Sequence, residues 1–166
     1  GHYMEYVTKY FGFERLLPSN TGAEAVEAAI KITRKWGYVK KGIPENKAEI
    51  IVCSQNFHGR TSTIISFSSD AGSKTNFGPH AQGFITIPYN DIEALESILE
   101  THPHIAGFLV EPIQGEAGVY TPDVDFMSKA NALCKEYNVL LMADEIQTGI
   151  GRTGSLLAVC GNCSCK

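Results

Sequence analysis

Two carboxylates follow the most apolar stretch of the sequence. Residues 139–143 are all apolar, and Asp144, Glu145 and Gln147 come directly after them. An unbroken apolar run predicts a strand buried on both faces of a parallel sheet. Open α/β sheets hold ligands at the carboxyl ends of their strands, where a carboxylate such as Asp144 can pair with a protonated ring nitrogen. An ordinary strand followed by a solvated turn explains this stretch, taken alone, equally well.

Two earlier apolar segments also end in polar side chains. Residues 49–53 lead to Phe57 and His58, and residues 105–110 lead to Glu111 and Glu116. An aromatic ring such as Phe57 can stack on a planar ligand. His58 could act as a base, although a lone histidine is more often an ordinary surface or core residue.

A further candidate lies at Thr21-Gly22-Ala23, where a helix is predicted to begin. Thr21 and Glu24 have the spacing of a capping box. The free N–H groups and positive dipole of a helix N-terminus suit a phosphate, and Gly22 lets the backbone come close to it. A plain N-cap accounts for the same residues and is the more common meaning of a capping box.

Two other motifs carry less weight. Residues 149–154 match G-x-G-x-x-G, but a dinucleotide site needs a helix opening at the glycines and a later strand with an acid, and neither is predicted. Cys160, Cys163 and Cys165 form C-x-x-C-x-C, which offers three of the four ligands of a structural zinc site. We therefore expect no metal centre. Cys53 and Cys134 lie in apolar segments and are expected to be core residues.

The composition is that of a soluble globular protein. The chain has 166 residues, of which 43% are hydrophobic and 19% charged, with a net charge of −4. The charges form no basic stripe for nucleic acid, and no apolar run is long enough to span a membrane. An odd number of cysteines without a regular framework favours a reducing cytoplasmic or organellar compartment.

The elements that must position these residues alternate along the chain. The residue patterns predict an α/β fold, with a mostly parallel sheet flanked by helices. Strands are predicted at 49–53, 84–87, 105–110 and 139–143, and helices at 4–13, from 21 to about 42, after a capping box of Asn90 and Glu93, and at 126–137. Residues 63–69 fit either a helix or a strand, and residues 70–83 are predicted to be a loop.

Four motifs together resemble the class III, pyridoxal-phosphate-dependent aminotransferases. They are Asn-Thr-Gly-Ala-Glu-Ala at 20–25, Asn-Phe-His-Gly-Arg-Thr at 56–61, Val-Glu-Pro-Ile-Gln-Gly-Glu at 110–116, and Ala-Asp-Glu-Ile-Gln-Thr-Gly at 143–149. They stand in the order of that family and at plausible spacing. Residues 34–38, 77–79 and 88–91 most resemble its ornithine aminotransferase branch, while Ser19 and His58 depart from the pattern of that branch.

The resemblance implies a role for each motif. Thr21, Gly22 and Ala23 would bind the phosphate of pyridoxal 5'-phosphate. Phe57 and Ile146 would pack on opposite faces of the ring, with His58 beside them. Asp144 would hold the ring nitrogen and Gln147 would reach the ring hydroxyl. On the substrate side, catalytic roles fall to Glu111 and Glu116.

The resemblance also implies parts that these residues do not supply. Such enzymes hold the cofactor as a Schiff base on a lysine, and no lysine here stands at a matching motif position. Residues 1–166 would be part of the large domain of a fold-type I transferase. An N-terminal segment, the rest of the large domain and the C-terminal small domain are expected to be absent, so the chain alone is expected to be inactive.

The function expected from the resemblance is ornithine transamination. The amino donor would be ornithine and the acceptor a 2-oxo acid, 2-oxoglutarate, in a ping-pong cycle within a homodimer. Acetylornithine or 4-aminobutyrate aminotransferase is the alternative within the family, and a non-catalytic pyridoxal-phosphate-binding module is the alternative outside it. No nucleic-acid or membrane partner is expected, and the location would be the cytoplasm, or the mitochondrial matrix in a eukaryote.

Overall fold

A four-stranded parallel sheet forms the centre of the molecule. The computed structural model describes residues 1–159, and within them the strand order is β2-β1-β3-β4. All neighbouring strands run parallel. The carboxyl ends of the strands therefore meet at one edge of the sheet. The strands are β1 (Glu49–Cys53), β2 (Phe84–Ile87), β3 (Ile105–Val110) and β4 (Leu140–Ala143).

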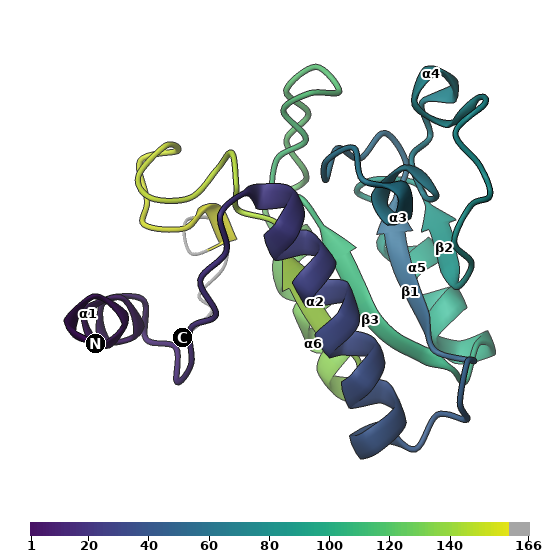
Figure 1. Ribbon diagram of the computed structural model, residues 1–166, viewed down its shortest axis with the longest axis horizontal. Helices are drawn as coiled ribbons and strands as arrows, with labels where there is room; N and C mark the ends of the chain where they lie inside the picture. The colour runs from purple at the N-terminus through teal and green to yellow at the C-terminus, as the bar shows by residue number, and fades with distance from the viewer. Residues whose placement is uncertain (160–166) are drawn as a thin grey trace.

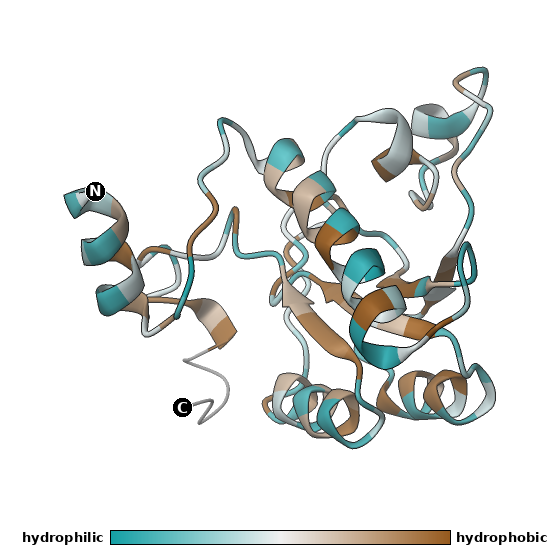
Figure 2. Cartoon of the chain, turned by 60° about the horizontal axis from the view of Figure 1, so that its bottom comes forward, coloured by the Kyte–Doolittle hydropathy of each residue, from teal (hydrophilic) through white to brown (hydrophobic). Residues whose placement is uncertain are grey.

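Helices cover both faces of this sheet. Figure 1 shows α2 crossing one face, while α5 and α6 lie behind the other. Figure 2 shows the apolar sides of α2, α5 and α6 turned towards the strands. The helices are α1 (His2–Phe11), α2 (Gly22–Trp36), the π-helix η1 (Gly37–Lys41), α3 (Ser62–Ile65), α4 (Ala71–Lys74), α5 (Ile92–Thr101) and α6 (Phe126–Glu136).

Each face of the sheet has its own apolar core. Ile30 of α2 packs with Val52 and Leu109 on one face. On the other face, Phe108 packs with Leu95 of α5 and Met127 of α6. Because β1 and β3 are the two central strands, their side chains contribute to both cores and are almost fully buried. The α/β prediction is therefore confirmed.

The strand predictions at 49–53, 84–87 and 105–110 agree with the structure to the residue. The fourth is correct in place but wrong in burial. Leu140, Leu141 and Met142 are half-buried and Ala143 is exposed. β4 pairs with β3 along one side, and among the described residues no strand pairs with its other side. An edge strand leaves part of its surface uncovered, however apolar its sequence.

The helix predicted from the Thr21 capping box is confirmed. Thr21 Oγ1 accepts a hydrogen bond from Glu24 N, and the Glu24 side chain accepts from Thr21 N. The helix continues into η1 and ends at Gly42, which is in the left-handed conformation with φ 80°. The sequence pattern did not predict the π-helix. There Gly37 packs so closely on Ala106 that a side chain at Gly37 would collide with it.

The second capping box was predicted wrongly. The cap of α5 is Asp91, whose side chain accepts a hydrogen bond from Ala94 N. Asn90 instead has a left-handed backbone, and its side chain accepts from Asp123 N. A carboxylate one residue closer to the helix provides the stronger acceptor, which explains the shift.

Two single-turn helices lie between β1 and β2. Residues 63–69 begin with the single-turn helix α3, and the predicted loop at 70–83 contains a second one, α4, capped by Asp70. Cys53 and Cys134 are buried core residues, as expected, and burial raises the pKa of both thiols. In the described part of the chain, no helix is long and apolar enough to cross a membrane.

Candidate cofactor site

The N-terminus of α2 lies at the carboxyl edge of the sheet. The first turn of a helix leaves its backbone N–H groups without intrahelical partners, and those of Gly22 and Ala23 are in this position. The N–H groups of Asn20 and Thr21 already donate to Glu24 Oε2, at 2.8 and 3.0 Å. Of the three residues predicted to bind a phosphate, Gly22 and Ala23 are therefore the ones with available donors.

A buried pair of side chains lies beside this turn. His58 Nδ1 is 2.6 Å from Asp144 Oδ2, and the two side chains are 0% and 6% exposed. The other oxygen of Asp144 accepts a hydrogen bond from Ile146 N at 3.1 Å. The Asp144 carboxylate is thus fixed from two sides where β4 ends. His58 lies within the protein and holds this carboxylate.

Glu111 follows β3 and is also buried. Its Oε1 accepts a hydrogen bond from Phe57 N at 2.9 Å, which ties the end of β3 to the segment that follows β1. Burial raises the pKa of the Glu111 carboxyl to about 7, although the Phe57 N–H and the nearby His58 lower it. Asp144 and Glu116 add to the increase, because like charges disfavour ionisation. This carboxyl therefore exchanges its proton near neutral pH.

Gln147 and Glu116 form a hydrogen bond between the segments that follow β4 and β3. Gln147 Nε2 donates to Glu116 Oε1 at 2.9 Å. Gly115 makes this possible, because a Cβ there would collide with Gln147 Oε1. Gly22 likewise allows a close approach, because a Cβ at Gly22 would lie 3.0 Å from the Ile146 side chain.

These residues enclose one cavity of about 90 Å³. Its walls are formed by the first turn of α2 and by the segments that follow β1, β3 and β4. Thr21 lies next to it in sequence, and Glu116 lines the neighbouring cavity rather than this one. Of the predicted site residues, those that line the cavity are Gly22, Ala23, Phe57, His58, Glu111, Asp144, Ile146 and Gln147.

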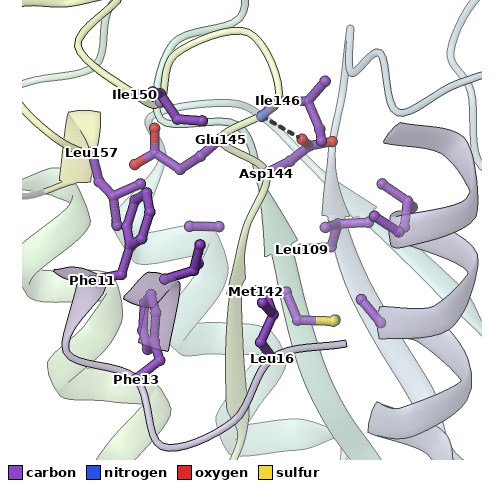
Figure 3. A pocket seen from close by; sticks show the side chains of 16 residues that line it. Phe11, Phe13, Leu16, Leu109, Met142, Asp144, Glu145, Ile146, Ile150 and Leu157 are labelled. Atoms are coloured by element: carbon purple, nitrogen blue, oxygen red, sulfur yellow. Dashed lines mark hydrogen bonds between the residues drawn. The ribbon is translucent and has the colours of Figure 1, made fainter. Parts of the chain in front are cut away.

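A larger apolar cavity of about 430 Å³ lies on the other side of the Asp144–Glu145 segment. In Figure 3, Phe11, Phe13 and Leu157 are on one side of it and Leu109 is on the other. Almost all of its lining is apolar, so it offers few groups that could orient a polar ligand. The smaller cavity brings together the ionisable groups and free N–H donors, and we therefore regard it as the candidate site.

The sequence pattern missed several residues that support the site. Glu145, paired with Asp144 in the sequence, turns away and accepts hydrogen bonds from the backbone N–H groups of Ala158 and Val159. Asn56 is buried and donates to Cys53 O and Phe67 O, which fixes the turn before Phe57. Arg60 lies over the Phe57 ring, 5.5 Å from its centroid. The motif around Phe57 contained Asn56 and Arg60, but periodicity gives no signal for such contacts.

Of the two weaker motifs, the structure describes only the glycine-rich one. Residues 149–154 form turns and a bend, and no helix of the described chain opens at these glycines. The three cysteines of the C-x-x-C-x-C cluster lie outside the described residues. Within residues 1–159, no group of three or more potential ligands is arranged to hold a metal ion.

The fold and this cavity define an α/β domain in which free helix N–H groups, an aromatic ring and a fixed carboxylate meet at the carboxyl edge of a parallel sheet. A family model for class III aminotransferases matches residues 1–162. The chain therefore belongs to the class III aminotransferases, which depend on pyridoxal phosphate.

Similar proteins support this assignment. Ornithine aminotransferase of Plasmodium falciparum is 54% identical over 152 residues, and the match covers 92% of this chain and 36% of that protein. The mitochondrial ornithine aminotransferase of Drosophila melanogaster is 53% identical over 159 residues, with 96% and 37% covered. The chain thus spans a little more than a third of the length of these relatives.

Solved structures agree with the fold. A structure of the ornithine aminotransferase from Toxoplasma gondii, described as having partial occupancy of pyridoxal phosphate, has a TM-score of 0.94 and 48% identity. The match covers 96% of this chain and 37% of that one. Acetylornithine aminotransferase from Elizabethkingia anophelis has a TM-score of 0.81 at 48% identity, with 98% and 36% covered.

Proposed function

We propose that this chain forms the cofactor-binding part of an ornithine aminotransferase. The observation that carries the proposal is the cavity at the sheet edge, where the N-terminus of α2, Phe57 and the fixed carboxylate of Asp144 meet. The similarity to ornithine aminotransferases supports the choice of substrate. The full enzyme would take an amino group from the δ-carbon of ornithine and pass it to 2-oxoglutarate.

The residues of the cavity fit pyridoxal phosphate. The N–H groups of Gly22 and Ala23 and the positive end of the α2 dipole suit its phosphate. Phe57 offers an aromatic face and Ile146, which is 62% exposed, offers an apolar one. Asp144 supplies a carboxylate for the ring nitrogen, and Gln147 supplies an amide for the ring hydroxyl.

When bound, the cofactor supplies an electron sink for the bond changes at the amino-acid carbon. The role of Asp144 is to keep the ring nitrogen protonated, which requires a carboxylate held in place and shielded from water. His58 and Ile146 N hold it in place through the contacts described above. Glu111 fixes the backbone of Phe57 and so the position of its ring.

Glu116 is proposed to act on the substrate side. It is exposed, it lines the cavity next to the cofactor site, and Gln147 holds its carboxylate. An anionic group there favours a cationic amino donor over a dicarboxylic acceptor. The resemblance further implies that an arginine outside the matched motifs neutralises this glutamate when the 2-oxo acid binds, so that one site accepts two substrates.

Further proposals concern the whole protein. The resemblance implies a Schiff-base lysine, which none of the quoted motifs supplies, and a homodimer with sites at its interface. The lysine, the small domain and the partner subunit would complete the catalytic machinery. We propose the cytoplasm or the mitochondrial matrix as its location, in keeping with a mitochondrial relative.

Two measurements test the proposal. Addition of pyridoxal phosphate to this chain should quench its tyrosine and tryptophan fluorescence with saturation, and Asp144→Ala should weaken binding by about tenfold, the effect of losing one charge-assisted contact. A chain that does not bind the cofactor, or a variant that binds it equally well, contradicts the assigned site. Turnover of ornithine by the full-length protein tests the substrate separately.

Acetylornithine is the second candidate donor, since the structure of an acetylornithine aminotransferase matches this chain as well as the structures of some ornithine aminotransferases do. The two donors differ in charge, because acetylation removes the cationic α-amino group. Glu116→Gln in the full-length protein should therefore raise the KM for ornithine but leave that for acetylornithine nearly unchanged. Turnover of acetylornithine with none of ornithine would reverse our choice.

A further inference from the structure

A second polar cavity lies at the β2 side of the sheet and shares no lining residue with the cofactor cavity. Its volume is about 370 Å³. It is bounded by the chain after α3, the end of α4 and the first part of β2, which lie close together in Figure 1. The proposed cofactor chemistry makes no use of this cavity. Its polar lining residues are Ser66, Ser68, Lys74, His80, Gln82 and Thr86.

One cation, Lys74, lines this cavity, and a second, Arg34, contacts two residues of its wall. Lys74 Nζ donates to Ser66 O at 3.0 Å, which leaves two of its three N–H groups for other acceptors. The Arg34 guanidinium lies behind the wall, where Nη2 donates to Gln82 O at 2.8 Å and the group stacks on the Phe84 ring. In the described part of the chain, neither Arg34 nor Lys74 forms an ion pair.

Two buried nitrogens, Arg34 Nε and His80 Nδ1, lack a hydrogen-bond partner. His80 Nδ1 carries a proton, and so can donate, in one of the two neutral tautomers of histidine. Buried polar atoms are normally satisfied, so these two nitrogens call for an acceptor: His80 lines the cavity, and Arg34 contacts Gln82 and Phe84 of its wall. Water would satisfy the nitrogens but would leave two positive charges uncompensated. An anion with several oxygens provides both acceptors and charge.

We propose that this cavity binds a phosphate group, through Lys74 and His80, with Arg34 adding positive charge from behind. Hydroxyl groups of Ser68 and Thr86 line the same space and can donate to further oxygens. The cavity has room for more than a phosphate alone. The ligand is therefore either inorganic phosphate or the phosphate end of a small molecule. This site is separate from the N-terminus of α2 and from the proposed transamination.

Phosphate titration followed by amide NMR tests the proposal, because the two phosphate sites report through different residues. Inorganic phosphate should cause saturable changes in the amide chemical shifts of Ser68, Ala81 and Gly83, independently of any changes at Gly22 and Ala23. Sodium chloride at equal ionic strength should not cause them. Lys74→Gln should weaken this binding at least about fivefold, since it removes one charge-assisted contact. Lys47→Gln, at an exposed lysine before β1, is the matched control and should bind like the wild type.

Glycerol 3-phosphate in place of inorganic phosphate identifies the kind of ligand. Tighter binding of the ester indicates a phosphorylated small molecule, and tighter binding of the free anion indicates phosphate itself. Shifts confined to Gly22 and Ala23, or equal shifts with chloride, would overturn the proposal. If Lys74→Gln does not fold because it loses its bond to Ser66, His80→Gln decides: unchanged phosphate affinity in that variant rejects the site.

Discussion

His58 Nδ1 lies 2.6 Å from Asp144 Oδ2, and both side chains are buried at the carboxyl edge of the sheet, in the segments that follow β1 and β4. The sequence separation is 86 residues, so this contact joins two motifs that looked independent. It changes the meaning of His58. The histidine supports the carboxylate that faces the cofactor cavity, and it does so from within the protein core.

Removing His58 should therefore affect both stability and cofactor binding. His58→Ala leaves the buried Asp144 without its main partner, and we expect a loss of about 2–3 kcal/mol in the free energy of unfolding. His58→Asn, whose amide can donate from nearly the same place, should restore part of it. Urea unfolding measures the change. His2→Ala, at a fully exposed histidine, is the control and should have no effect.

Glu111 should make the stability of the chain depend on pH. Burial raises its pKa to about 7 in the folded state, whereas the pKa of a glutamate in an unfolded chain is about 4.3. Between these values the folded chain keeps a proton that the unfolded chain has lost. The stabilisation from Glu111 is thus fully present at low pH and is lost as the pH rises through about 7.

The variant Glu111→Gln isolates this effect, because the amide oxygen can still accept from Phe57 N. We expect it to be more stable than the wild type by about 2 kcal/mol at about pH 8, and the difference to shrink towards about pH 5. Glu45→Gln, at an exposed position, should show no such trend. A constant difference across this pH range would show that Glu111 does not titrate near neutrality.

Gln147 and Glu116 should act on cofactor binding as one unit. Gln147→Ala removes an amide from the cavity, and Glu116→Ala frees that amide from its partner, so each should weaken pyridoxal phosphate binding by about threefold to tenfold. In the Gln147→Ala background, the Glu116 substitution should add little. Gly115→Ala should weaken binding similarly, because its Cβ would displace Gln147. Additive effects in the double variant would disprove the coupling.

Gly107 in β3 should tolerate no side chain. A Cβ there would lie 2.6 Å from Thr33 Cγ2 and 2.8 Å from Met142 Cε, in the contact between α2 and the sheet. Overpacking of this kind costs about 1–3 kcal/mol, so Gly107→Ala should lower the urea midpoint clearly. Gly115→Ala, which meets only the end of a flexible side chain, should leave stability nearly unchanged. Equal midpoints for the two variants would contradict this packing.

Much of the fold could be predicted from the sequence, because its signals are local. β1, β2 and β3 are short apolar runs between turn residues, and the cap of α2 has both members of its capping box. The half-buried state of β4 could not be predicted in this way. It depends on which strands lie beside it, and a run of apolar residues carries no information about its neighbours.

The site was predicted by its motifs but not by its contacts. Asp144, Phe57 and Gln147 each follow a strand end, and parallel strands bring such ends together. The partners of Asp144 and Gln147 come from distant segments, as does the space left by Gly115. Such pairings arise from the register of the strands and the path of the loops, which residue periodicity does not describe.

The state of the ring nitrogen tests the central claim most directly. When pyridoxal phosphate labelled with ¹⁵N in its ring binds to this chain, the ring nitrogen should give the ¹⁵N chemical shift of a protonated pyridine at neutral pH, because Asp144 is fixed beside it. In Asp144→Asn the same ligand should give the shift of a neutral ring. If the nitrogen is protonated equally in both proteins, or if the cofactor does not bind, Asp144 is not its partner and the proposed site is wrong.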